Sequence, residues 1–145
     1  MEETVKDKWF KIRTLIESVF NKTPDLSAIL YIVGMRELGQ PRTKFSKEEK
    51  VRLMHIATCR VLSTSGHYKL TGVDEKEWPV WELVSKLPNQ DMLEQEMYLR
   101  HHIINYFEEE ELTSIEKISN QINESISLLV EKKLDLFSST VNNKK

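Results

Sequence analysis

Apolar side chains recur every three or four residues along most of this chain of 145 residues. Near the N-terminus, for example, they fall at Val5, Trp9, Ile12, Ile16 and Val19. This spacing places them on one face of an α-helix, because a helix completes a turn in about 3.6 residues. The 4 glycines and 4 prolines also leave few positions for tight turns. We therefore expect a predominantly all-α fold of long helices.

Local capping signals set the ends of the predicted helices. Ser46 and Glu49 have the spacing of a capping box, in which each side chain bonds the backbone N–H of the other residue. Thr113 and Glu116 repeat this spacing, and Gly39 suits the left-handed residue that closes a helix. These signals and the apolar spacing predict helices over residues 3–20, 26–38, 47–63, 79–87, about 90–107 and 113–137.

Residues 66–87 interrupt this pattern, since they are neither repetitive nor clearly helical before Pro79. The partial alternation from His67 to Val73 is compatible with an extended segment. The whole sequence predicts a single-domain bundle of five to six helices over 1–145, with an irregular, aromatic-rich insert at 66–87. The polar residues 138–145 are expected to form a flexible tail.

Composition favours a cytoplasmic protein that does not enter a membrane. Cys59 is the only cysteine, so no internal disulfide can form, which is typical of a reducing compartment. The N-terminus lacks a signal peptide pattern, and no window approaches about 18 apolar residues. The net charge of −2 is too small to draw the chain to nucleic acid or a membrane surface.

Few residue patterns indicate chemistry. His55 and Cys59 lie one helical turn apart, but a structural zinc site needs four ligands and a catalytic site three. His101 and His102 are adjacent, so on a helix their side chains point about 100° apart. No glycine-rich phosphate loop or nucleophile elbow is present. The sequence therefore predicts no metal, no cofactor and no identifiable catalytic residue.

Two segments supply candidate binding residues. The basic linker over 36–52 offers Arg42 and Lys44 for a phosphate or a nucleic acid, although neighbouring glutamates offset much of its charge. The aromatic insert acts either as a structural lid or as a recognition surface, with His67 and Tyr68 expected to be exposed. The candidate binding residues are His67, Tyr68, Trp78, Trp81, Arg42 and Lys44.

The leading functional interpretation is a non-enzymatic, cytoplasmic protein-interaction module. It would bind a protein partner or a second copy of itself through the amphipathic helix 113–137, the aromatic insert, or both. The alternative is a small-molecule-binding protein or enzyme, with a pocket between the insert and helix 47–63 lined by His55, His67, Tyr68, Trp78 and Trp81. Nucleic-acid binding through the linker 36–52 is a weaker hypothesis.

Overall fold

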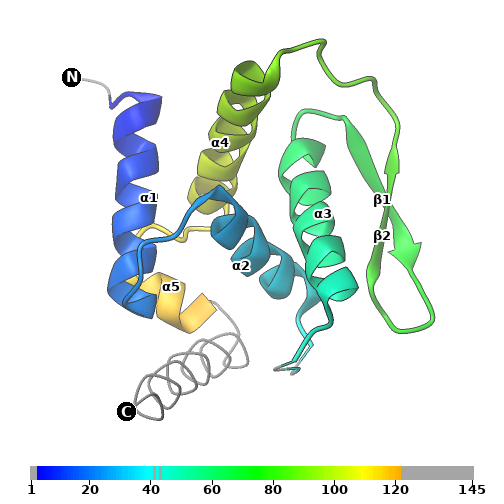
Figure 1. Cartoon of the computed structure of the whole chain (residues 1–145), viewed down its shortest axis with the longest axis horizontal. Helices are drawn as coiled ribbons and strands as arrows, with labels where there is room; N and C mark the ends of the chain where they lie inside the picture. The colour runs from blue at the N-terminus through cyan, green and yellow to red at the C-terminus, as the bar shows by residue number, and fades with distance from the viewer. Residues whose placement is uncertain (1–2, 41, 43, 122–145) are drawn as a thin grey trace, which may run out of the picture.

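The computed structural model describes residues 3–40, 42 and 44–121, which form five helices and a two-stranded antiparallel sheet (Figure 1). In chain order the elements are α1 (Val5–Phe20), α2 (Leu26–Leu38), α3 (Lys47–Ser63), β1 (Tyr68–Val73), β2 (Pro79–Leu83), α4 (Met92–Glu109) and α5 (Ile115–Gln121). The prediction of a mostly helical fold is confirmed. The fold is mixed and not purely all-α, because part of the insert forms strands.

Reciprocal side-chain capping begins α1, α3 and α4. The predicted box at Thr113 and Glu116 is wrong, because α5 begins at Ile115 and the Ser114 hydroxyl accepts from Lys117 N at 3.1 Å. The predicted box at Ser46 and Glu49 begins α3, with the hydroxyl accepting from Glu49 N at 3.1 Å and the carboxylate accepting from Ser46 N at 2.9 Å. The predicted bounds of α2 and α3 agree with the structure. Helix α4 begins after Asp91, which forms its own box with Glu94, so its start lies slightly later than predicted.

The insert forms a hairpin because Asp74 shapes its turn. The Asp74 carboxylate accepts hydrogen bonds from the backbone N–H groups of Lys76 and Trp78, both at 2.9 Å. The chain then returns beside β1, with Tyr68 opposite Leu83. The predicted helix over 79–87 is wrong, since Pro79–Leu83 gains its backbone partners from β1 instead of from a helical turn.

The core lies where the helices meet, and α3 stands between α2 and the hairpin (Figure 1). Helix α1 packs against α4 and α5. The predicted burial of α2 is evident from its buried residues, Ile29, Leu30, Ile32, Val33, Gly34, Met35 and Leu38. One continuous apolar cluster includes residues of all five helices and Trp78 of the hairpin. The hairpin is thus anchored to the helical core.

The predicted continuation of the last helix to residue 137 and the predicted tail at 138–145 lie outside the described residues. A single domain over 1–145 therefore stays a prediction. Among the described residues, no helix combines the length and the apolar character needed to cross a membrane.

Candidate functional site

The chain turns sharply between α3 and β1, and this turn presents Ser65 beside α4. Helix α3 ends where Ser63 and Thr64 donate their hydroxyl protons back to helix carbonyls, at 2.6 and 3.0 Å. Such local bonds compete with further helix. Gly66 follows with φ +80°, a left-handed conformation that glycine adopts easily. Ser65 itself is exposed to solvent.

Ser65 lies at hydrogen-bond distance from a buried histidine of α4. Its Oγ is 2.6 Å from Nε2 of His102, whose side chain belongs to a residue only 2% exposed. The other ring nitrogen, Nδ1, is 2.7 Å from the carbonyl oxygen of Tyr98. A carbonyl can only accept, so Nδ1 carries the proton and Nε2 accepts from the Ser65 hydroxyl. A serine held against an oriented, unprotonated imidazole is the arrangement of a nucleophile with its general base.

A second histidine lies in the same cluster. His67 Nδ1 donates to the carbonyl of Ser85 at 3.3 Å, and its Nε2 accepts from the Tyr98 hydroxyl at 2.7 Å. The Tyr98 ring also lies against His102, with ring centroids 4.3 Å apart. Tyr98 therefore contacts both histidines, once through its ring and backbone and once through its hydroxyl.

Burial lowers the pKa of His102 from its usual value of 6.5. The unfolded chain therefore takes up a proton on this residue at a higher pH than the folded protein does. The contribution to folding stability is complete above about pH 6.5 and is lost as the pH falls toward the lower folded pKa. Following the imidazole signals of His102 by NMR is expected to give a midpoint below that of free histidine; an equal or higher midpoint would contradict the buried neutral ring.

The predicted pair His55 and Cys59 lies nearby on α3 but lacks the features of a reactive thiol or a metal site. Cys59 Sγ is 3.5 Å from His55 Nε2, and burial raises the pKa of the thiol to about 11. A thiolate is therefore disfavoured near neutral pH. Within the described residues, no group of three or more histidine, cysteine or acidic side chains could hold a metal ion.

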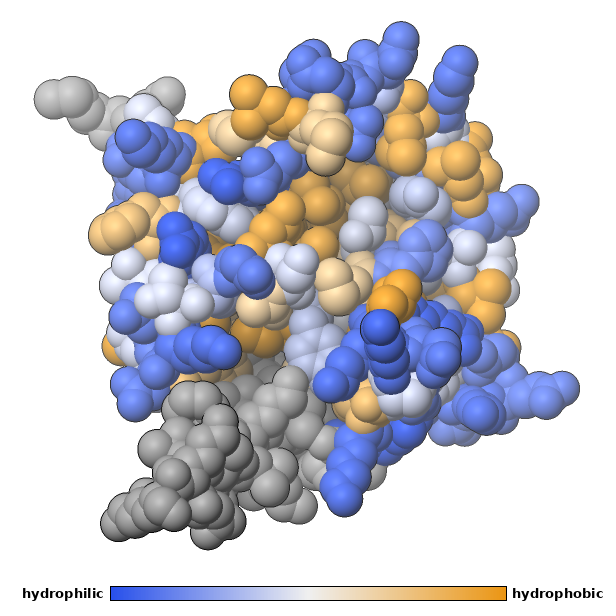
Figure 2. Space-filling view, in the orientation of Figure 1, coloured by the Kyte–Doolittle hydropathy of each residue, from blue (hydrophilic) through white to orange (hydrophobic). Residues whose placement is uncertain are grey.

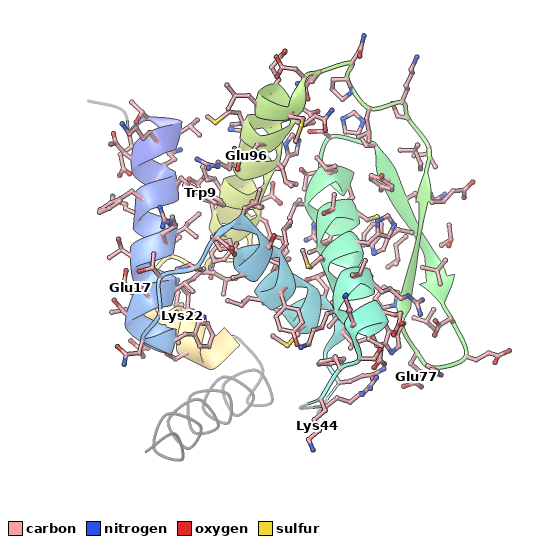
Figure 3. All side chains as sticks on the ribbon, in the orientation of Figure 1. Trp9, Glu17, Lys22, Lys44, Glu77 and Glu96 are labelled. Carbon is pink, nitrogen blue, oxygen red and sulfur yellow. The ribbon has the colours of Figure 1, made fainter. Side chains whose placement is uncertain are left out.

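The predicted binding residues are distributed over separate places. Trp78 is 2% exposed, with Arg42 and Arg52 against its ring at 6.0 and 4.9 Å, so it anchors the hairpin to the core. Lys44 extends away from the body of the molecule (Figure 3). His67 is 8% exposed, contrary to the expected exposure, because the base of the hairpin and Tyr98 enclose it.

The hairpin face toward α3 is only partly covered. Tyr68 and Trp81 on this face pack against the core. Cross-strand pairing places Leu83 and Leu70 on the same face, yet they remain 52% and 51% exposed. Trp81 Nε1 is buried, and no hydrogen-bond partner for it lies in the described part of the chain. Figure 2 shows apolar surface at the edge of the molecule formed by the hairpin.

Arg36 and Arg42 of the basic linker make internal contacts. Arg42 bonds both carboxylate oxygens of Glu49, at 2.6 and 3.0 Å. Arg36 bonds the hydroxyl of Tyr106, which itself donates to Glu37 at 2.6 Å. Arg36 therefore joins α2 to α4, and Arg42 joins the linker to the first turn of α3.

Ser65, Tyr98 and His102 were not predicted from the sequence to form one site. Tyr98 and His102 are one turn apart on α4, a spacing that was a usable local signal. Ser65 had none, because the distance of 37 residues between it and His102 is closed only by the packing of α4 beside α3.

The fold and the site define a mostly helical protein with a serine–histidine pair at the junction of a helix and a hairpin. Over 43 residues, the chain is 54% identical to the peptidyl-tRNA hydrolase of Pelagibacter ubique (strain HTCC1062). The match covers 30% of this chain and 23% of that protein, so the chain spans less than a quarter of its relative. No protein family and no solved structure matches the chain.

This similarity corrects the leading functional interpretation. A non-enzymatic interaction module is contradicted, because the relative is named as an enzyme. The alternative, a small-molecule-binding protein or an enzyme, agrees better with this finding.

Proposed function

We propose that this protein is a hydrolytic enzyme that cleaves an ester or a similar acyl bond, with Ser65 as nucleophile and His102 as general base. The observation that carries the proposal is the 2.6 Å contact between the exposed Ser65 hydroxyl and the buried His102 Nε2. The name of the partial relative, a hydrolase of peptidyl-tRNA, supports this class of reaction. The proposal names the type of bond that is cleaved, an acyl bond, and no particular substrate.

The proposed reaction transfers one proton in each step. The Ser65 oxygen bonds to the substrate carbonyl carbon while its proton moves to His102 Nε2. The Tyr98 carbonyl, 2.7 Å from Nδ1, stabilises the resulting imidazolium. His102 then returns the proton to the departing alcohol, leaving an acyl-serine. Water hydrolyses this ester with the same imidazole as base, which regenerates Ser65.

The lowered pKa of His102 favours this role. A base must be unprotonated when substrate binds, and a pKa below 6.5 keeps most of the imidazole neutral at pH 7. Val84 and Leu83, which are 53% and 52% exposed, follow one another at the base of the hairpin, where Val84 N donates to the carbonyl of His67. We propose that they receive an apolar part of the substrate.

Substituting Ser65 with alanine tests the proposal with little risk to folding, because this side chain is exposed. We expect Ser65→Ala to lower kcat/KM for p-nitrophenyl esters by at least about 100-fold, since a positioned general base contributes roughly 10²–10⁴-fold. The matched control is Ser63→Ala, which removes a hydroxyl bonded only to the nearby Arg60 carbonyl. Equal activity of the two variants, or an inactive parent protein, would reject Ser65 as nucleophile.

A cytoplasmic location and self-association are further proposals. The buried, unpaired Cys59 supports a reducing compartment. The bond of Arg42 to Glu49 makes this arginine less available to a phosphate, which is why nucleic-acid binding through the linker 36–52 stays the weaker hypothesis. Gel filtration over a range of concentrations tests self-association.

A further inference from the structure

A cavity of about 210 Å³ lies between α1 and α4, away from the serine–histidine pair. Its apolar lining comes from α1, α4 and the segment after α4, and consists of Ile12, Leu15, Ile104, Phe107 and Leu112. Figure 3 shows Trp9 of α1 directed toward α4, where Arg100 lies 5.2 Å from its ring. This contact joins the two helices beside the cavity. The whole pocket exceeds the roughly 150 Å³ of a cavity that holds benzene, so it has room for a branched aliphatic or aromatic side chain against its apolar residues.

The remaining lining consists of Thr113 and four charged side chains, which form two ion pairs. Lys8 Nζ lies 3.2 Å from Glu108 Oε1, and Lys11 Nζ lies 2.6 Å from Glu3 Oε1. All four side chains are substantially exposed, so each ion pair contributes little free energy. Each charged group can therefore exchange its partner for a group of a ligand. The lining thus offers two ammonium groups, two carboxylates and an apolar floor.

We propose that this cavity binds a free apolar α-amino acid of the size of leucine, methionine or phenylalanine. The side chain lies on the apolar floor. The ligand carboxylate meets Lys8 or Lys11, and its ammonium group meets Glu108 or Glu3. When one ion pair opens, the carboxylate and ammonium groups of an amino acid pair with the lysine and the glutamate that are released. A ligand with a single charge leaves one lysine or one glutamate without its partner.

This proposal is independent of the proposed hydrolysis, because it uses none of the residues of the serine–histidine cluster. Binding is measured by titrating the full chain with L-leucine and L-phenylalanine while recording its methyl NMR spectrum. We expect the methyl signals of Leu15, Ile104 and Leu112 to move and the thermal midpoint to rise at about millimolar concentration. Absence of methyl shifts, or shifts confined to other parts of the protein, would overturn the proposal.

The charge requirement is tested with analogues that lack one group. Isovalerate retains the carboxylate of leucine, and isoamylamine retains its ammonium group. We expect each to bind at least about tenfold more weakly than L-leucine, because each leaves one lining charge unpaired. Equal affinity of all three would reject recognition of a zwitterion.

Two variants locate the site. Lys8→Gln removes an ammonium group from the lining and is expected to weaken binding of L-leucine by at least about threefold. Lys22→Gln is its matched control, because Lys22 is an exposed lysine beyond the end of α1. Thr113→Trp places a large ring at an exposed lining position and is expected to prevent binding without unfolding the protein. Unchanged affinity in both Lys8→Gln and Thr113→Trp would overturn the assignment.

Discussion

Replacing Gly34 with alanine is expected to cost more than about 4 kcal/mol of folding free energy, enough to unfold much of the protein at room temperature. Gly34 lies in α2 where this helix crosses α3. An added Cβ would overlap the carbonyl oxygen of Leu53 and lie 2.7 Å from its carbonyl carbon. Both atoms belong to helix backbone, so rotation of a side chain cannot relieve the overlap. Urea unfolding followed by circular dichroism measures the loss.

Gly66→Ala is the matched control. Nothing lies within 4 Å of a Cβ built at Gly66, but its φ of +80° remains unfavourable for alanine. We expect a loss of about 1–2 kcal/mol from backbone conformation alone. If Gly34→Ala costs no more than Gly66→Ala, then α2 and α3 do not approach as closely as the structure shows.

Replacing Trp78 with alanine is expected to lower the free energy of unfolding by about 3–5 kcal/mol, the usual cost of removing a buried large aromatic side chain. Trp78 is 2% exposed and forms an edge contact with Phe45, with ring centroids 6.2 Å apart. Arg52 lies 4.9 Å from its ring and also bonds Asp74 at 2.7 Å. The substitution therefore removes the packing of the hairpin turn on Phe45 and on Arg52 of α3, while the bond of Arg52 to Asp74 can persist. Thermal and urea unfolding measure the effect.

Val80→Ala serves as the control within the same hairpin. Val80 is 38% exposed and pairs with Gly72, so its removal leaves a smaller cavity. We expect its cost to stay below about 1.5 kcal/mol. A Trp78→Ala variant as stable as Val80→Ala would show that Trp78 does not anchor the hairpin, and would restore its interpretation as a recognition residue.

The helices could be predicted because their signals are local. The box of Ser46 and Glu49 involves residues three apart, and Gly39 closes α2 through its own backbone conformation, with φ +65°. The bounds of α2 and α3 were therefore readable from the sequence. The start of α4 was less so, because Asn89 and Asp91 are both acceptable caps. Asp91 is distinguished by Glu94 three residues later, a local capping-box spacing that the sequence prediction overlooked.

The hairpin was mispredicted because Pro79 is compatible with the first turn of a helix as well as with a strand. The Asp74 turn and the pairing with β1 stabilise the extended conformation of Pro79–Leu83 over a helical one. Formation of the hairpin also buries His67 and Trp78, because it brings both side chains against the helices. The residue types alone did not reveal whether these two side chains face solvent.

The sequence by itself determined the positions of the long helices and of their apolar faces, because capping and periodicity act over a few residues. Tertiary structure decided that the insert becomes a hairpin, that α2 approaches α3 at Gly34, and that Ser65 meets His102. These features depend on groups far apart in the chain, whose approach requires the whole core to form. The spacing of neighbouring residues does not indicate which residues far apart in the sequence come into contact. The candidate site could therefore be recognised only in the folded protein.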